Sequence, residues 1–344
     1  MFKNIKGQKH ATNLLETLIK GNRFPHALLF YGNKGVGKFT VAKEIVKFFN
    51  CQNPDIQNKG KDNCNICNRI EKEQYPDFFI VRREITEDKN KKTKQAKELK
   101  IEQIKKLIQQ TNLMPFESKY KFYIIEDAET LNIESSNALL KTLEEPRPNN
   151  YIILITNNIN KIIDTIYSRC VKIKFNDLPA DILKELIIKK YDIDSELAGK
   201  IALISNGSMS KAKLLLSENN YESIFELFNS TIKLLTAKLL NVEQIETLTK
   251  ELTALGQDYL EIILELLLIY FNEVYLATVY EIQRETFFKK VLKLKNQNIN
   301  FKQYNMMLTH IMKSRYELTD TNINVNLLLK NLFITIKETI DGSI

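Results

Sequence analysis

The sequence predicts an α/β protein in which a parallel sheet covered by helices is followed by an all-helical region. In the first half, short apolar runs typical of buried strands alternate with helical patterns, and this alternation favours parallel pairing. A glycine-rich stretch, GNKGVGKFT at residues 32–40, lies between one such strand and a helix. After Phe175 the strand patterns stop, and nearly every later segment has helical spacing.

Four strands are predicted in the first half, at residues 27–31, 78–81, 122–125 and 151–156. A helix is predicted to open at residues 41–46, directly after the glycine-rich stretch. Strand, glycine-rich loop and helix in this order form the context in which such a loop binds phosphate.

A junction is predicted where the strand patterns end, at Asp177-Leu178-Pro179. Helical spacing then runs from Ala180 to the end of the chain, with breaks at 206–208 and near 219–220. These breaks divide the chain into three predicted domains, with the bounds 1–175, 176–220 and 221–344.

The composition is that of a soluble globular protein, with 44% hydrophobic and 27% charged residues among 344. The net charge of +8 is compatible with nucleic-acid contact but does not establish it. The most apolar stretch, 259–270, contains Glu261 and Glu265 and is too short to span a bilayer, so it predicts a buried helix. Four cysteines without a secretory signal indicate reduced thiols or metal ligands, and the expected location is the cytoplasm.

The stretch GNKGVGKFT nearly matches a phosphate-binding loop. Gly32, Gly37 and Lys38 fit the pattern of Gly, four residues, Gly and Lys, and Gly35 adds the flexibility that turns backbone N–H groups toward one anion. The alternative is a glycine-rich turn with a chance lysine, which the flanking strand and helix disfavour.

The last position of the motif, where a hydroxyl should hold Mg²⁺, is Phe39. Thr40 is a further candidate for nucleotide binding, but one residue along a helix turns a side chain by about 100°, so Thr40 does not replace the missing hydroxyl.

The predicted strand at 122–125 ends in Glu126 and Asp127. Nucleotide hydrolases of the phosphate-loop class place a Mg²⁺-supporting Asp, and often a Glu that polarises water, at such a strand end. The usual order is Asp-Glu, so the reversed order moves both carboxylates away from their ideal positions.

Further motifs carry a family resemblance: PHALLF at 25–30, LLKTLEEP at 139–146, Thr156-Asn157, and TIYSRC at 165–170. On these, with the phosphate loop and the strand ending at Asp127, the chain resembles bacterial clamp-loader subunits of the DNA polymerase III holoenzyme, of the AAA+ class. The resemblance covers roughly residues 1–175. It implies an AAA+ phosphate-loop domain with a parallel sheet, then a small helical lid and an all-helical collar domain for oligomerisation.

The resemblance also implies roles for single residues. In this family the arginine of the Ser-Arg-Cys motif, here Arg169 beside Ser168, projects toward the γ-phosphate of ATP bound to a neighbouring subunit. A planar, permanently charged guanidinium stabilises the charge of the phosphoryl group in transfer. The resemblance places Thr156 and Asn157, with Glu126 and Asp127, among the nucleotide-binding residues. The alternative for Arg169 alone is a surface ion pair.

Cysteines after the phosphate-loop helix match part of the family's zinc module, expected here within 51–70. Cys51, Cys64 and Cys67 are present, but one position of the usual Cys-x-x-Cys-x-x-Cys trio is Lys61, a poor ligand when protonated. Either three thiolates hold Zn²⁺ with Asp62 or water as the fourth ligand, or the segment is a loop that has lost its metal.

Three altered positions favour a stator of the delta-prime type, without ATPase or polymerase activity of its own. These are Phe39, the Glu-Asp order, and Ser210, which stands where active subunits carry a sensor arginine. The expected partners are the motor (gamma/tau-type) and delta subunits, and, through the complex, the sliding clamp and primer-template DNA. ATP or ADP is an expected ligand without efficient hydrolysis, and no membrane contact is expected.

Two other functions are weighed beside this one. The first is the ATP-hydrolysing motor subunit of the same clamp loader, which a Ser or Thr at position 39 would have favoured. The second is a phosphate-loop nucleotide kinase, which predicts an arginine-rich substrate lid, whereas the chain from Ala180 onward is apolar and poor in arginine.

Overall fold

A computed structural model describes residues 2, 4–52, 64–87, 93–96, 98–217, 220–237, 241–279, 299–320 and 323–342. The chain forms two compact units, the first made of residues 1–186 and 206–210 and the second of 187–205 and 211–344. The division into three domains with boundaries after residues 175 and 220 stays a prediction.

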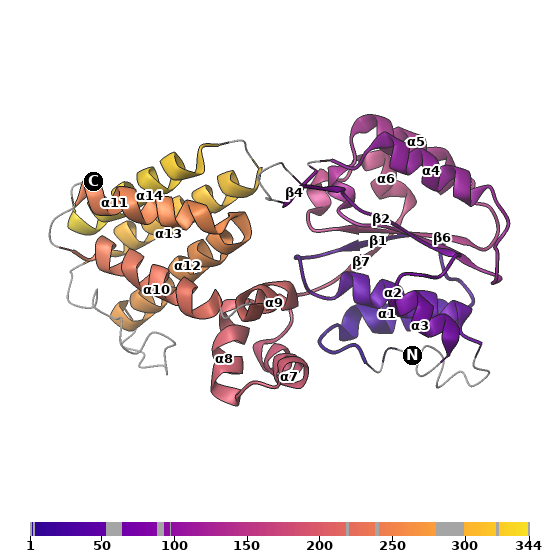
Figure 1. Ribbon diagram of the computed structural model, residues 1–344, viewed down its shortest axis with the longest axis horizontal. Coiled ribbons are helices and arrows are strands. Elements are labelled where there is room, and N and C mark those ends of the chain that lie inside the picture. Colours follow the sequence, from indigo (N-terminus) through magenta and orange to yellow (C-terminus); the bar gives the residue numbers. More distant parts are fainter. Residues whose placement is uncertain are drawn as a thin grey trace. The chain divides into compact units, whose positions relative to one another are not determined.

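The first unit is built on a five-stranded sheet with the order β2-β5-β6-β1-β7, all pairs parallel (Figure 1). The strands are β1 (Ala27–Tyr31), β2 (Phe78–Val81), β5 (Lys121–Ile125), β6 (Asn150–Thr156) and β7 (Val171–Lys174). The four predicted strands are confirmed. The fifth, β7, has no apolar run because it lies at the edge of the sheet and buries only Ile173 fully.

Helices cover both faces of the sheet (Figure 1). On one side lie α1 (Lys9–Lys20), α2 (Lys38–Asn50) and α3 (Asn65–Glu71), and on the other α4 (Ile101–Thr111), α5 (Ile133–Glu144) and α6 (Asp164–Arg169). Successive strand residues alternate between the two cores, so Leu28 and Phe30 pack with α1 and α2 while Leu29 joins the core on the other side. Burial on both faces explains why these strands are continuous apolar runs.

Shorter elements complete this unit. A two-stranded antiparallel hairpin pairs β3 (Ile85–Glu87) with β4 (Thr93–Gln95), in a segment that we did not predict as strand. Single turns of 3-10 helix follow β5 and β6, at Ala128–Thr130 and Ile159–Lys161.

From Ala180 onward, every regular element in the described part of the chain is a helix, as predicted. The helices are α7 (Ala180–Tyr191), α8 (Ser195–Ile204), α9 (Met209–Leu216), α10 (Asn220–Leu235), α11 (Val242–Leu255), α12 (Gln257–Val279), α13 (Phe301–Asp320) and α14 (Val325–Asp341).

The apolar stretch 259–270 lies within α12 and is buried in the second unit, as predicted. Its carboxylate Glu265 has a side chain only 4% exposed, but it pairs with Lys211 of α9. The adjacent Glu261 accepts from Arg315 of α13 at 3.2 Å. A buried carboxylate is tolerated when it is paired and hydrogen-bonded, so these contacts explain acidic residues in an otherwise apolar helix.

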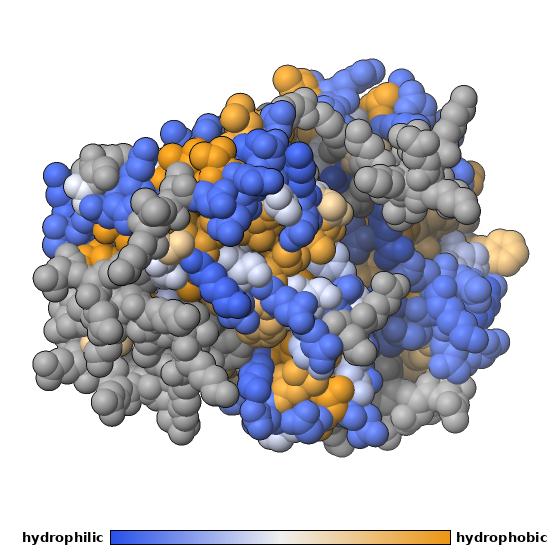
Figure 2. Space-filling view, turned by 60° about the vertical axis from the view of Figure 1, so that its left-hand side comes forward, coloured by the Kyte–Doolittle hydropathy of each residue, from blue (hydrophilic) through white to orange (hydrophobic). Residues whose placement is uncertain are grey.

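The surface view in Figure 2 shows several separate apolar areas divided by hydrophilic side chains. Among the described residues, no helix combines the length and the apolar character needed to cross a membrane.

One buried carboxylate fixes the loop that leads into β5. Asp77, 1% exposed, accepts hydrogen bonds from the backbone N–H groups of Phe116, Glu117 and Ser118 at 2.7, 2.8 and 3.0 Å. Its own carbonyl accepts from the N–H of Phe122 at 3.0 Å. Asp77 therefore ties the start of β2 to the start of β5.

We predict that Asp77→Ala lowers the free energy of unfolding by about 3 kcal/mol, because three backbone N–H groups lose a buried, charged acceptor. Urea unfolding followed by circular dichroism measures the loss. The control Asp181→Ala removes an exposed carboxylate of α7 and should change stability by less than about 0.5 kcal/mol. Equal losses in the two variants would contradict the role of Asp77.

Candidate functional site

The predicted nucleotide residues meet at one edge of the sheet. Because all five strands run in the same direction, the segments that follow them open at the same edge, where α/β proteins bind ligands. These segments begin with Gly32 after β1, Arg82 after β2, Glu126 after β5, Asn157 after β6 and Phe175 after β7.

The glycine-rich loop packs closely against its neighbours. Gly32 has a φ of 146°, and a Cβ there would lie 2.2 Å from the carbonyl oxygen of Phe175. Gly35 has a φ of 83°, and a Cβ there would lie 2.3 Å from Ser208 Oγ. Both positions therefore require glycine for space as well as for backbone conformation. Gly37 caps the N-terminus of α2, the end of a helix that attracts anions.

Lys38 lies at the start of α2 and is 5% exposed. Its ammonium group donates to the backbone carbonyls of Gly32 and Asn33, the latter at 2.7 Å, and to Asn157 Oδ1 at 2.9 Å. Burial lowers the pKa of Lys38 to about 8, although the nearby carboxylates of Glu129 and Asp127 oppose this. The cation that would meet a phosphate is thus held by the loop itself.

Asn157 joins this lysine to the acidic residues. Its Nδ2 donates to Glu129 Oε1 at 3.1 Å and to Asp127 Oδ1 at 3.3 Å, while its Oδ1 accepts from Lys38. The predicted role of Asn157 in nucleotide binding stays a prediction. Thr156 is also buried, but its hydroxyl is used locally, donating to the carbonyl of Asn158 at 3.0 Å.

The two predicted acidic residues, Asp127 for Mg²⁺ support and Glu126 for polarising water, are each bound by an arginine. Arg82 Nε donates to Glu126, and Arg83 donates to Asp127 Oδ2 from Nε at 2.8 Å. Burial raises the pKa of Glu126, with Arg82 opposing the rise. Phe39 stands where the metal-binding hydroxyl belongs, and its ring lies 4.9 Å from the guanidinium carbon of Arg82. This donor set does not fit Mg²⁺, which prefers free oxygen ligands.

Thr40 lies exposed on the first turn of α2, next to the half-buried Phe39. Phe39 packs against the core formed with α1 and α2, so the two side chains point to different surroundings. The role of Thr40 in nucleotide binding stays a prediction.

The segment with the missing sensor arginine packs directly on the loop. Ser208 Oγ donates to the carbonyl of Lys34 at 2.8 Å, and the N–H of Met209 donates to the carbonyl of Gly35 at 3.0 Å. The backbone nitrogen of Ser210 would lie 2.7 Å from a Cβ at Gly35. At this position, therefore, a short side chain and backbone groups contact the loop.

Arg169 lies elsewhere, at the amino-terminal ends of the strands, opposite to the carboxyl ends where the phosphate loop lies. It ends α6, and β7 begins two residues later with Val171 paired to Leu28 near the start of β1. Its guanidinium donates to Glu144 Oε1 from Nε at 2.7 Å, and to the carbonyl of Thr165 at 2.9 Å. Ser168 Oγ accepts a longer bond from it at 3.4 Å. Arg169 and Ser168 are thus brought together with α5 rather than with the phosphate loop.

The three predicted zinc ligands converge. Cys51 follows α2, Cys64 precedes α3 and Cys67 lies within it, and their sulfur atoms are within 4.8 Å of one another. Tetrahedral zinc with Zn–S bonds of about 2.3 Å needs sulfur separations of ~3.8 Å, so this cluster fits the ion. The suggested fourth ligand, Asp62, and Lys61 lie outside the described residues.

The thiols of this cluster interact with one another. Burial, together with the neighbouring Cys51 and Cys64 sulfurs, raises the pKa of Cys67. Burial acts to raise the pKa of Cys64 as well. Hydrogen bonds from backbone N–H groups, chiefly that of Cys67, have the larger effect, so the pKa of Cys64 is lowered overall. Three adjacent thiolates are unfavourable without a cation, which a bound metal ion would supply.

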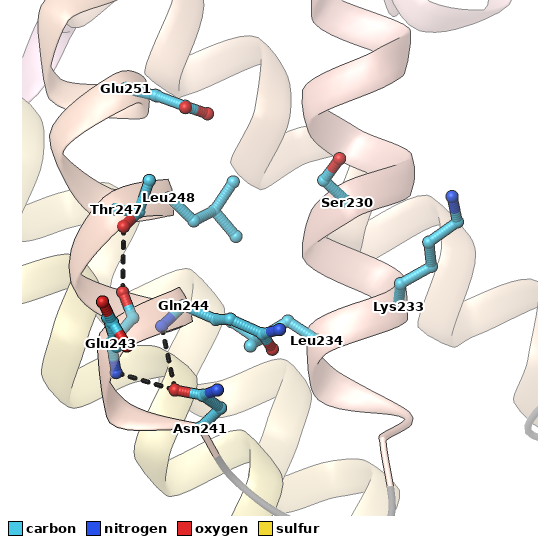
Figure 3. A pocket seen from close by; sticks show the side chains of 9 residues that line it. All are labelled: Ser230, Lys233, Leu234, Asn241, Glu243, Gln244, Thr247, Leu248 and Glu251. Atoms are coloured by element: carbon cyan, nitrogen blue, oxygen red, sulfur yellow. Dashed lines mark hydrogen bonds between the residues drawn. The ribbon is translucent and has the colours of Figure 1, made fainter.

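An open hollow of about 520 Å³ lies between α10 and α11 of the second unit (Figure 3). Asn241 Oδ1 accepts from the N–H groups of Glu243 and Gln244, and Thr247 donates to the carbonyl of Glu243 at 3.0 Å. The hydrogen bonds drawn there serve α11 itself, and we assign no ligand to this hollow.

Comparisons with known proteins identify the family. The model of the family described as "DNA polymerase III, delta subunit" matches residues 7–179. DNA polymerase III subunit gamma of Buchnera aphidicola subsp. Schizaphis graminum is 31% identical over 339 residues, covering 92% of this chain and 90% of that protein. The chain belongs to the bacterial clamp-loader subunits of DNA polymerase III, in the AAA+ class. The predicted resemblance is confirmed.

The relatives of this clamp-loader subunit carry different subunit names. DNA polymerase III subunit delta' of Bacillus subtilis is 30% identical over 216 residues, 63% of this chain and 61% of that protein. The crystal structure of a gamma-subunit-related protein from Thermotoga maritima covers 95% of this chain and 99% of its own, at 16% identity and a TM-score of 0.47.

Sequence reasoning missed three residues of this clamp-loader subunit: Arg82, Arg83 and Glu144. The sequence did contain a signal for the two arginines. They directly follow the predicted strand 78–81, just as Glu126 and Asp127 follow the predicted strand 122–125. Glu144 lies inside the LLKTLEEP motif, which carried the resemblance but gave no indication that this carboxylate contacts Arg169.

We predict that purified protein contains about one equivalent of zinc, because three converging thiolates can bind the ion. Changing Cys64 and Cys67 to Ser should remove the metal, as measured by elemental analysis after purification without chelators. The control Cys170→Ser alters a buried cysteine of the opposite core and should leave the zinc content unchanged. A metal-free wild-type protein would instead support a loop that has lost its metal.

Proposed function

We propose that this chain is the delta-prime type of clamp-loader subunit, a stator that supplies Arg169 to the ATP site of a neighbouring motor subunit. The observation that carries the proposal is the position of Arg169 at the edge of the sheet opposite to its own phosphate loop. From Leu28 to Tyr31, the stretch of β1 that separates the two edges, the chain advances about 10 Å. An arginine in this place serves a phosphate brought by another chain.

The altered phosphate loop supports the same proposal. Phe39 offers no oxygen to a metal ion, Glu126 and Asp127 stand in reverse order, and Ser210 is too short to contact a γ-phosphate. Each change lowers hydrolysis, and all three concern the same phosphoryl group. ATP or ADP would be held by Lys38 and the backbone N–H groups of the loop, without efficient turnover.

In the isolated chain Arg169 is paired with Glu144. Their side chains are 33% and 47% exposed, and an exposed ion pair contributes only about 0–1 kcal/mol. Glu144 therefore holds the guanidinium weakly, and a phosphate with more negative charge would displace it. The intact arginine and its weak internal partner suit a residue that acts after assembly.

The proposed partners follow from the family. We propose that the chain assembles with motor subunits of the gamma/tau type and with delta, and meets the sliding clamp and primer-template DNA through that complex. The net charge of +8 is compatible with a position near DNA.

A motor subunit is the second candidate function. The relative from Buchnera aphidicola, matched over nearly its whole length, is named subunit gamma. In a motor, Lys38 would be essential for hydrolysis at the chain's own site. The two candidates therefore differ in which residue, Lys38 or Arg169, the activity requires.

We predict negligible ATPase activity for the isolated chain and stimulation of motor partners in the presence of sliding clamp and primed DNA. Arg169→Ala should reduce that stimulation by roughly 10³-fold or more, because the neighbour's phosphoryl group loses its guanidinium. Steady-state ATPase assays measure the rates, and size-exclusion chromatography should show that assembly survives.

Arg147→Ala is the matched control, because it removes another exposed arginine of the same unit, and it should leave stimulation unchanged. Lys38→Ala should have a much smaller effect than Arg169→Ala. If Lys38→Ala abolishes activity while Arg169→Ala is silent, the chain is a motor.

A further inference from the structure

Two arginines that belong to no predicted motif, Arg82 and Arg83, contact the acidic residues at the end of β5. Arg82 donates to Glu126 and, from Nη1 at 2.7 Å and Nη2 at 3.0 Å, to Glu73. Arg83 binds Asp127 Oδ2 through Nε and Nη2, at 2.8 and 2.7 Å. Both carboxylates at the end of β5, the one expected to support a metal ion and the one expected to polarise water, are therefore already engaged by cations of the same chain.

The hydroxyl that would complete a metal site is also missing. Phe39 replaces the hydroxyl, and its aromatic face attracts cations; Arg82 lies at 4.9 Å from the ring centroid and Lys43 at 5.5 Å. The guanidinium of Arg82 thus contacts both Phe39 and Glu126.

We propose that Arg82 and Arg83 take the place of the metal ion in this site, so that it binds nucleoside di- and triphosphates as metal-free anions. The inference rests on the proposed function only in assuming that the phosphate loop retains affinity for nucleotide.

Charge and geometry both support this assignment. Two guanidinium groups carry the same total charge as one Mg²⁺ ion, and they are fixed in place by partners beyond the acid pair. Glu73 holds Arg82, and the carbonyl of Ala96 accepts from Arg83 at 3.4 Å. An incoming Mg²⁺ would have to displace charge-assisted hydrogen bonds and meet two like charges, both of which oppose its binding.

The test measures binding of N-methylanthraniloyl-ATP to the full-length chain by fluorescence, with either excess Mg²⁺ or EDTA. The Kd should agree within about twofold between the two conditions. Coordination of Mg²⁺ worth about 1.4 kcal/mol would instead make the Kd differ tenfold. The combined variant Phe39→Ser, Arg82→Gln, Arg83→Gln should bind about tenfold more tightly with Mg²⁺ than with EDTA.

Arg69→Gln is the matched control, because Arg69 forms a similar two-bond pair with Glu117, at 2.6 and 3.0 Å, within the same unit. It should bind as the wild type does. Arg83→Gln alone, a milder change that frees Asp127, should shift binding toward Mg²⁺ dependence even if the combined variant does not fold.

Mg²⁺-dependent binding by the wild type would overturn the proposal, and so would a folded combined variant that gains no Mg²⁺ dependence. Absence of nucleotide binding under both conditions would also overturn it. That last result would leave the stator function untouched, because the ATPase of the motor partners reports on Arg169 and not on this loop.

Discussion

The common direction of five strands is the constraint on which the site depends. Residues far apart in the chain become neighbours only because each follows the carboxyl end of a strand, and these ends share one edge. The same constraint sends Arg169, which precedes β7, to the other edge. One sheet thereby separates the phosphate-loop residues from Arg169.

At the carboxyl edge, the charged groups are satisfied within the chain. The ammonium of Lys38 rests on backbone carbonyls and Asn157, and the guanidinium groups of Arg82 and Arg83 rest on carboxylates. A site designed for turnover keeps its metal ligands free and its cation available to phosphate. Here each has an internal partner within the same chain.

The sequence predicted the fold from features that are local. Apolar runs mark four of the five strands, and Phe39 is visible within its motif. The pairing of Arg82 with Glu126 joins residues 44 positions apart and depends on β2 lying beside β5, an order that periodicity does not encode. The pairing of Arg169 with Glu144 likewise needs α5 and α6 to be placed in space. Edge strand β7 was missed because an exposed strand lacks the apolar run by which the others were recognised.

The contact between Arg169 and Glu144 makes any engagement with a neighbour an exchange of one anion for another. No bare guanidinium has to be created, and the carboxylate left behind is exposed enough to be hydrated. The exchange favours an anion with more charge and more acceptor oxygens than a carboxylate, which describes a terminal phosphoryl group better than the side chains of a protein surface. In the proposed stator, Glu144 would therefore disfavour pairing of Arg169 with the ordinary acidic side chains of a subunit interface.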